Sequence, residues 1–422
     1  MRIKCLFLAL IGFYTTKIVA QSPDQIYESA IHTVLFAPMG SPLAAPITDI
    51  NGSNVLQLSF DDLNANYEDY YYSIELMDSV WKPVELSDFE YVKGFNQNKI
   101  TTYSVSSIAT QKYFHYQLSF PNNYCAPKLS GNYILKVFKN NNKDQVVFTK
   151  RFYVVENIAG VLAMAQAPFD GSISRSHQKI KVSVDTRNIP SFQNDRITIK
   201  VIQNNRFNDA KTVTTPNFIR GYVLEFNDEL ELIFPGGNEA RWLDLQSLQL
   251  RSDRVAELNN KDHLTTVLVK PDISRNNLLY ASYRDLNGGY LIMNTESLQN
   301  ENQNDYALVV FTYLTKDHTA YLDKKLYLAG ALTNNVLDKN AEMQFDASIG
   351  AYQKKILIKQ GYYSYNYILR DRLQPTSIDD FLETEGSYTE TENEYTILVY
   401  YHAPGTRNDQ IIGFASVNTS QN

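Results

Sequence analysis

The sequence predicts an all-β protein, and three observations support this class. Apolar and polar residues alternate with a period of two in the ranges 133–138, 178–184 and 196–202, which is typical of antiparallel strands with one solvated face. Tyrosine is abundant, with 30 Tyr against 2 Trp, and its ring suits half-buried pleated surfaces. Sustained apolar stripes with a helical period are absent apart from short pieces. We therefore expect tandem β-sandwich domains.

The first 20 residues have the organisation of a secretory signal peptide. Arg2 and Lys4 precede an apolar run over 5–14, and Ala20 offers a cleavage position. This run is shorter than the roughly 20 apolar residues that a membrane-spanning helix needs. Cys5 lacks the preceding residues of a lipid-attachment site. We therefore expect residues 1–20 to be removed, and the mature protein to be soluble outside the cytoplasm.

The mature chain is acidic. Residues 1–20 contain three basic residues and no acidic ones, so their removal changes the formal net charge from −7 to −10. Nucleic acids and anionic lipids are bound by basic surfaces, so both are poor candidates as partners. Cys125 is the only cysteine left after processing, which excludes an intramolecular disulfide. Stability must therefore come from apolar burial.

Turn signals and strand patterns divide the mature chain into three predicted domains. The N-terminal β-sandwich domain covers 22–155, with strands expected at 55–60, 70–76, 103–107, 113–120, 131–138 and 145–155. The central β domain, 156–290, ends in a predicted hairpin between 278–283 and 290–293, because Asn287-Gly288 is a hairpin turn signal. Strands of the C-terminal domain, 291–422, are expected at 305–313, 325–330, 356–359, 361–369, 394–401 and 411–417.

The C-terminal range resembles the early-set immunoglobulin-like modules found beside carbohydrate enzymes. A strand ends in Gly330, and a later strand begins Gly361-Tyr362-Tyr363-Ser364-Tyr365. The resemblance implies an early-set immunoglobulin-like fold. It does not extend to glycan binding, because 332–337 offers no aromatic ring to stack on a sugar. We expect Tyr363, Tyr365 and Tyr367 to share one face of a strand and pack in a core.

The sequence contains no recognisable catalytic or cofactor-binding motif. The oxygens of Asp62, Asn64 and Asn66 imitate the opening of a calcium loop, but Tyr67 and Ser73 stand where glycine and a bidentate glutamate are required. A turn with Asx hydrogen bonds is the simpler interpretation. Five glutamates between 383 and 394 are expected in a solvated loop and strand entry. We predict no enzyme activity, no cofactor and no metal.

Nine short sequence motifs, which we call words, occur in order at 58–63, 93–95, 115–122, 130–133, 203–206, 236–239, 271–275, 285–288 and 391–395. They resemble those of the plug proteins of the type IX secretion system, a family of exported Gram-negative proteins. The resemblance covers most of the chain, from about residue 51 to residue 417. The resemblance implies a monomeric periplasmic protein, peripheral to the outer membrane, that occludes the periplasmic mouth of the translocon β-barrel. A periplasmic or surface glycan-binding or enzyme-accessory protein is the alternative.

The same words supply candidate partner-binding residues: Asp61, Asp62, Arg206, Gly236, Gly237, Asn238 and Glu239. From the residues alone, Asp61 and Asp62, and Glu239 with Arg241, are candidates for structural ion pairs or for a partner-facing surface. The central stretch up to residue 244 is predicted to help fix the mutual orientation of the domains.

Overall fold

The computed structural model describes residues 23–260, 263–295, 303–373 and 380–421. The predicted signal peptide lies outside these residues. Strands make up nearly all of the regular structure, and the α-helix within the described ranges, α1 (Asp88–Tyr91), has 4 residues. The predicted all-β class is confirmed. None of the helices in these ranges combines the length and the apolar character that a bilayer crossing requires.

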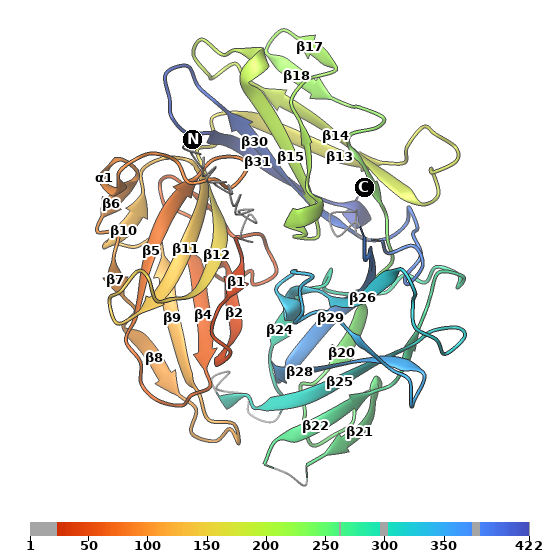
Figure 1. Cartoon of the computed structure of the whole chain (residues 1–422). Coiled ribbons are helices and arrows are strands. Elements are labelled where there is room, and N and C mark those ends of the chain that lie inside the picture. The colour runs from red at the N-terminus through yellow and green to blue at the C-terminus, as the bar shows by residue number, and fades with distance from the viewer. Residues whose placement is uncertain (1–22, 261–262, 296–302, 374–379, 422) are drawn as a thin grey trace, which may run out of the picture.

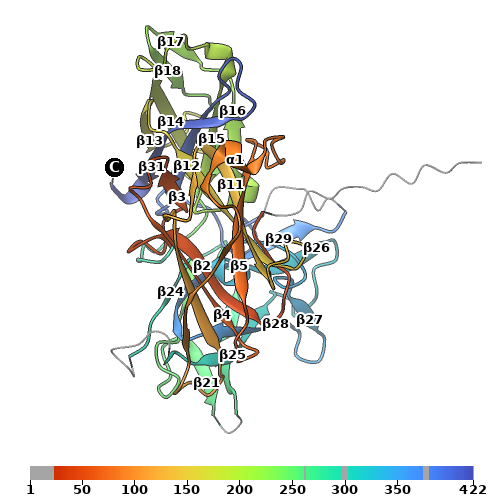
Figure 2. The same ribbon diagram turned by 90° about the vertical axis from the view of Figure 1, so that its left-hand side faces the viewer.

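Three large hydrophobic cores organise the strands, and we call the parts of the chain around them lobes. The first lobe is 23–157, the second lobe is 158–235 with 391–421, and the third lobe is 236–390. In Figure 1 the first lobe lies on the left, the second at the top and the third at the lower right. The molecule is narrower in the view of Figure 2, so the lobes form a flattened triangle rather than a string.

The first lobe is a β-sandwich built on alternating strands. Leu56, Leu58 and Phe60 of one strand are fully buried, because every second side chain points to the same face. The sheet β2-β4-β9-β8 packs against the sheet that contains β5, β11 and β12. The strands are β1 (Gln25–Ile26), β2 (Ile31–Pro38), β3 (Ile47–Asp49), β4 (Leu56–Asp62), β5 (Tyr70–Met77), β6 (Val92–Gly94), β7 (Asn98–Lys99), β8 (Thr102–Val105), β9 (Phe114–Phe120), β10 (Cys125–Pro127), β11 (Gly131–Lys139) and β12 (Val146–Val155).

The second lobe joins two distant parts of the chain. Its core combines Ile180 and Val182 with Ile397 and Val399, all fully buried. The first part holds β13 (Gly160–Gln166), β14 (His177–Asp185), the 3-10 helices η1 (Asn194–Arg196) and η2 (Phe207–Asp209), β15 (Ile197–Gln203), β16 (Lys211–Val213), β17 (Phe218–Arg220), β18 (Val223–Phe226) and β19 (Ile233–Pro235). The second part holds β30 (Glu394–Tyr401), β31 (Gln410–Asn418) and η5 (Thr419–Gln421).

The third lobe is a sandwich of two sheets, one around β29 and one around β25. Tyr363, Tyr365 and Tyr367 lie in its core, which confirms their predicted packing role. Its elements are β20 (Arg241–Asp244), β21 (Val255–Asn259), β22 (Thr265–Val269), β23 (Asp272–Ile273), β24 (Tyr290–Ile292), β25 (Tyr306–Leu314), β26 (Lys324–Ala329), η4 (Ala331–Thr333), β27 (Gln344–Asp346), β28 (Ala351–Lys359) and β29 (Gly361–Asp371).

The border expected at residue 290 does not separate two cores. β15, from the predicted central range, pairs with β30 of the predicted C-terminal range. β20, also from the central range, pairs with β29 in the third lobe. The predicted central and C-terminal ranges therefore each contribute strands to the second lobe and to the third lobe. The third lobe is inserted in the sequence of the second. Strands pair wherever an apolar face can be buried, and the alternation within a strand does not specify its partner.

The hairpin expected at 278–293 does not form. β24 pairs with β29, while residues 278–283 contain no strand. The turn signal itself is real, because Asn287 and Gly288 have φ values of 51° and 78°, as such a turn requires. The turn leads into a strand whose partner lies much later in the chain.

A continuous sheet joins the first and second lobes. β12 pairs with β31 in parallel at Val155 and Ile411, which gives the strand order β16-β15-β30-β31-β12-β11-β5-β7. A small buried cluster covers this joint, and it includes Tyr153, Leu398 and Tyr400. Arg151 is also buried here, with its guanidinium 4.0 Å from the centre of the Phe207 ring. The two lobes therefore share both a sheet and a packed interface.

Candidate functional site

The chain crosses between the second and third lobes twice, and the two crossings lie against each other. It enters the third lobe through 235–241 and returns through 384–394. The carbonyl of Gly237 accepts hydrogen bonds from the Tyr388 N–H and the Thr391 hydroxyl, both 2.8 Å. The Asn393 side-chain amide donates to the Gly236 carbonyl at 2.8 Å. We call this paired segment the junction, and it contains the central stretch that the sequence singled out.

Gly236 is required at the junction because its backbone passes very close to the other crossing. A Cβ atom at this position would overlap the carbonyl oxygen of Tyr388. Gly236→Ala is expected to destabilise the folded chain by about 1–3 kcal/mol, since the backbone must shift to relieve the clash. Thermal unfolding of the purified variant measures this loss.

Gly171→Ala is the matched control for that prediction. A Cβ atom at Gly171 would meet nothing within 4 Å. Its transition temperature should therefore stay close to that of the unmodified chain. Equal transition temperatures for the two variants would show that the close approach at Gly236 does not require glycine for stability.

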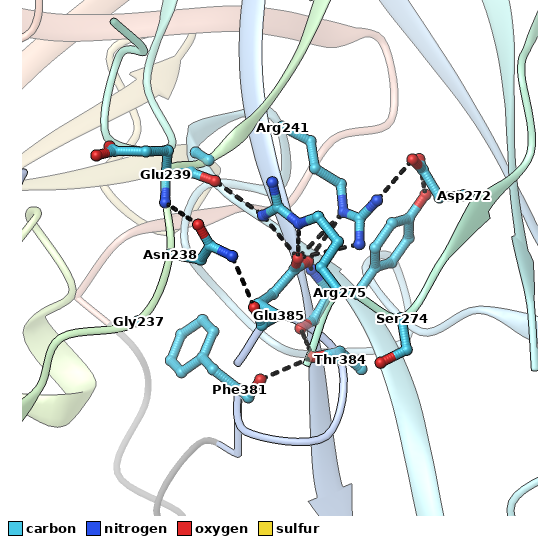
Figure 3. A network of polar contacts seen from close by, with 12 residues as sticks. Gly237, Asn238, Glu239, Arg241, Asp272, Ser274, Arg275, Phe381, Thr384 and Glu385 are labelled. Atoms are coloured by element: carbon cyan, nitrogen blue, oxygen red, sulfur yellow. Dashed lines mark hydrogen bonds and ion pairs between the residues drawn. The ribbon is translucent and has the colours of Figure 1, made fainter. Parts of the chain in front are cut away.

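A buried polar network anchors the returning crossing to the core of the third lobe (Figure 3). Arg241, 5% exposed, lies with its Nη1 2.7 Å from Oδ1 of Asp272 and its Nη2 3.0 Å from Oε2 of Glu385. Arg275 lies 2.7 Å from the same Glu385 oxygen. Asp272 in turn accepts hydrogen bonds from the hydroxyls of the core tyrosines, Tyr365 and Tyr367.

This network corrects two expectations from the sequence. Arg241 pairs with Asp272 and Glu385 and not with Glu239, whose carboxylate points away from both arginines in Figure 3. Glu385, expected in a solvated loop, is only 1% exposed. Burial alone would lower the pKa of Arg241, but the carboxylates of Glu385 and Asp272 raise it above its ordinary value. Arg241 is therefore a cation that compensates two buried carboxylates.

Asp61 connects the first lobe to the third. Its side chain is fully buried, and Oδ2 lies 2.7 Å from Nζ of Lys359 and accepts a hydrogen bond from the Tyr306 hydroxyl at 2.6 Å. His115 Nδ1 lies 2.6 Å from Oδ1. Burial alone would raise the pKa of Asp61, but the hydrogen bond from His115 and the charge of Lys359 lower it below its ordinary value. Of the two roles left open for Asp61, the structure supports the structural ion pair.

Asp62 makes local contacts, whereas Arg206 contacts a neighbouring lobe. Asp62 is buried and accepts hydrogen bonds from the Tyr70 hydroxyl at 2.8 Å and from the Asn64 N–H at 2.9 Å. The second bond is the Asx turn expected in place of a calcium loop. Arg206, in the second lobe, places its guanidinium 4.4 Å from the centre of the Phe381 ring in the third lobe.

None of the seven candidate partner-binding residues is exposed in the structure. Asp61, Asp62, Gly236 and Glu239 are buried, while Arg206, Gly237 and Asn238 are half-buried. Gly236, Gly237, Asn238 and Glu239 come together at the junction. Asp61 and Asp62 lie in the first lobe, and Asp61 faces the third. That these residues bind a partner stays a prediction. In the structure, most of them make contacts between lobes.

Sequence reasoning missed Asp272 and Lys359, and it misplaced Glu385. Lys359 stands at the end of an apolar strand, where a single charge is an ordinary strand boundary. Its partner Asp61 is 298 residues away, so no spacing rule connects the two. Words at 236–239, 285–288 and 391–395 do converge at the junction. The sequence showed the order of these words along the chain, but it did not show that they lie close together in the folded protein.

A cavity of about 610 Å³ lies between the lobes. Residues from all three lobes line it, including Lys150 from the first, Phe207 from the second and Tyr290 from the third. Asp285 and Glu392 belong to its wall. Within the described part of the chain, Asp285, Glu392 and Glu239 form a group of acidic side chains that are close enough together to hold a metal ion.

Comparison with known proteins supports the fold and the family. Residues 31–156 match the family described as "Type 9 secretion system plug protein 1st domain". A crystal structure of a hypothetical protein from Parabacteroides merdae ATCC 43184 is similar, with a TM-score of 0.89 and 29% sequence identity. The similarity covers 94% of this chain and 98% of that one. A search of curated proteins found no match.

Fold and junction together define an all-β protein in which three lobes are joined pairwise. The resemblance read from the short words is confirmed by the match over 31–156. Residues 31–156 therefore match the first domain of type IX secretion system plug proteins.

Proposed function

We propose that the protein is a non-catalytic plug that occludes the periplasmic mouth of the outer-membrane translocon barrel of the type IX secretion system. The match of residues 31–156 to the plug family supports an association with this secretion system and a place in the periplasm near the outer membrane. The observation that carries the proposal is the bracing of the three lobes against one another. A plug must resist deformation across an opening, and a string of loosely linked domains would not.

Each pair of lobes has its own joint. The first and second lobes share a continuous sheet through β12 and β31. The first and third are held by the buried ion pair of Asp61 and Lys359. The second and third are tied by the junction around Gly236 and Gly237. Since the three joints close a triangle, bending at one joint is opposed by the other two.

Size is consistent with this role. The largest known barrels have 36 strands, and such a barrel has a backbone circle roughly 70 Å across. One lobe of about 130 residues corresponds to a sphere only about 36 Å wide. The whole mature chain as one compact body is about 55 Å wide, and inward side chains reduce the lumen further. Closure of the opening therefore requires all three lobes to act as one body.

A tagged copy of the protein should co-purify with a very large outer-membrane β-barrel from detergent-solubilised envelopes. A strain that lacks the protein should also become more permeable to antibiotics that are too large for porins, because the translocon is left open. Complementation with the unmodified chain should restore the barrier.

An unrelated periplasmic β-sandwich protein with the same tag serves as the control for the purification. Recovery of no barrel, together with unchanged permeability in the deletion strain, would contradict the plug proposal. Recovery of soluble polysaccharide in place of a barrel would favour the accessory role considered from the sequence.

A further inference from the structure

Three carboxylates from three separate segments meet beside the junction. Glu239 follows β19, Asp285 precedes β24, and Glu392 lies just before β30. One oxygen of each side chain lies within 4.8 Å of the others. Glu239 is 1% exposed and Asp285 is 8% exposed, while Glu392 is half-buried. We call these residues the carboxylate trio.

Basic side chains compensate the trio only weakly. Among the residues that the structure describes, none of its three carboxylates forms an ion pair. The charge of Arg275 acts on Glu239 without direct contact between the two side chains, because Arg275 donates to the backbone carbonyl of Glu239 and pairs with the carboxylate of Glu385. Buried like charges at this separation repel strongly unless something neutralises them.

The trio is held in place by N–H and O–H donors. Asp285 accepts from the N–H groups of Asn287 and Ala240. The side-chain amides of Asn287 and Asn418 donate to Glu392. These bonds fix the directions of the carboxylates without cancelling their charge.

One oxygen of the trio is left without a partner. Oε1 of Glu239 accepts from the Tyr280 hydroxyl and from the N–H of Glu392, so the carboxylate is aimed at the segment that carries Glu392. Oε2 of Glu239 is buried and accepts no hydrogen bond within the described residues. An unsatisfied buried carboxylate oxygen is costly, and its cost is removed when the oxygen binds a cation.

We propose that Glu239, Asp285 and Glu392 bind one divalent cation of the calcium class. All three donors are oxygens, which hard cations prefer, and the group offers no histidine or cysteine to a softer metal. Calcium–oxygen distances of about 2.3–2.6 Å allow two ligand oxygens to lie up to about 5 Å apart. Magnesium is usually bound through only one or two carboxylates and keeps several waters, so a group of three carboxylates fits calcium better. Water from the adjoining cavity completes the coordination.

The cation would stabilise the junction, because it would link both crossings to the third lobe. Glu239 lies in the crossing 235–241, Glu392 in the crossing 384–394, and Asp285 in the third lobe. This inference goes beyond the proposed function and does not depend on it, since the site is tested on the purified chain alone.

Calcium should raise the thermal transition temperature of the chelator-treated chain by several degrees, and magnesium should raise it less. Isothermal titration with calcium chloride should give one equivalent per chain. Glu239→Gln should abolish the calcium-dependent shift. In chelator the same variant should melt at a higher temperature than the unmodified chain, because it removes one carboxylate from a buried acidic cluster.

Glu394→Gln is the matched control, since Glu394 lines the same cavity but lies outside the trio. It should keep the full calcium shift. The proposal is overturned if the unmodified chain melts at the same temperature in calcium and in chelator, or if Glu239→Gln retains the shift. A larger response to magnesium than to calcium would overturn the assigned class of ion.

Discussion

Replacement of Arg241 by methionine is expected to lower the free energy of unfolding by about 3–5 kcal/mol. Methionine fills much of the arginine volume, but it leaves Asp272 and Glu385 buried without their shared cation. Removal of one member of a buried ion pair costs this much when the remaining charge loses its partner. Here Arg254 still pairs with Asp272 and Arg275 with Glu385, so the lower end of this range is expected. The returning crossing should also loosen, since Glu385 would lose its contacts with Arg241 and keep those with Arg275, Tyr367 and Asn238.

Thermal unfolding and limited proteolysis together measure the Arg241 effect. Cleavage in the range 384–394 should accelerate in Arg241→Met before the cores unfold. Arg187→Gln is the control, because Arg187 belongs to an exposed ion pair with Asp185 and such pairs contribute little. An Arg241 variant that melts and is cleaved like the control would show that the network does not anchor the crossing.

Asp61→Asn is expected to destabilise the chain by about 3 kcal/mol at neutral pH, because Lys359 would stay buried without its carboxylate. The effect should depend on pH. The pKa of Asp61 is lowered in the folded chain, so the ionised carboxylate stabilises the fold above the ordinary aspartate pKa of about 3.9. As the pH falls below that value and through the folded-state pKa, the contribution is lost.

The difference in transition temperature between the unmodified chain and Asp61→Asn should therefore be largest above about pH 5 and should narrow below about pH 4. Asp144→Asn is the control, because Asp144 is exposed and belongs to no ion pair among the described residues, and this variant should differ little from the unmodified chain across this range. A difference that stays constant down to pH 3 would contradict the assignment of the acid-sensitive charge to Asp61.

The strands themselves were largely predictable. Strands expected at 178–184 and 196–202 appear as β14 and β15, because period-two alternation is a local property that burial of one face enforces. The Asx turn at Asp62 and the core position of Tyr365 were likewise readable from neighbouring residues.

Pairing between distant strands was not predictable. Thr396 in β30 pairs with Ile202 in β15, and nothing in either local pattern specifies the other. The junction shows the same limit, since Asn238 and Glu385 meet only because the chain leaves the second lobe and later returns to it. Alternation determines which face of a strand is buried, while partner choice depends on the free energy of the whole assembly.

Because the second lobe is built from two distant parts of the chain, it can be completed only after the third lobe has been synthesised. Gln203 and Tyr395, hydrogen-bonded in its core, are 192 residues apart, so a nascent chain contains β15 long before β30 exists. The third lobe can form within that interval and bring the ends of the loop together, which reduces the entropy that closure must overcome. Until β30 arrives, β15 presents an open strand edge, and such edges invite aggregation. A chain interrupted near residue 390 would keep that edge open permanently, whatever the state of its other two cores.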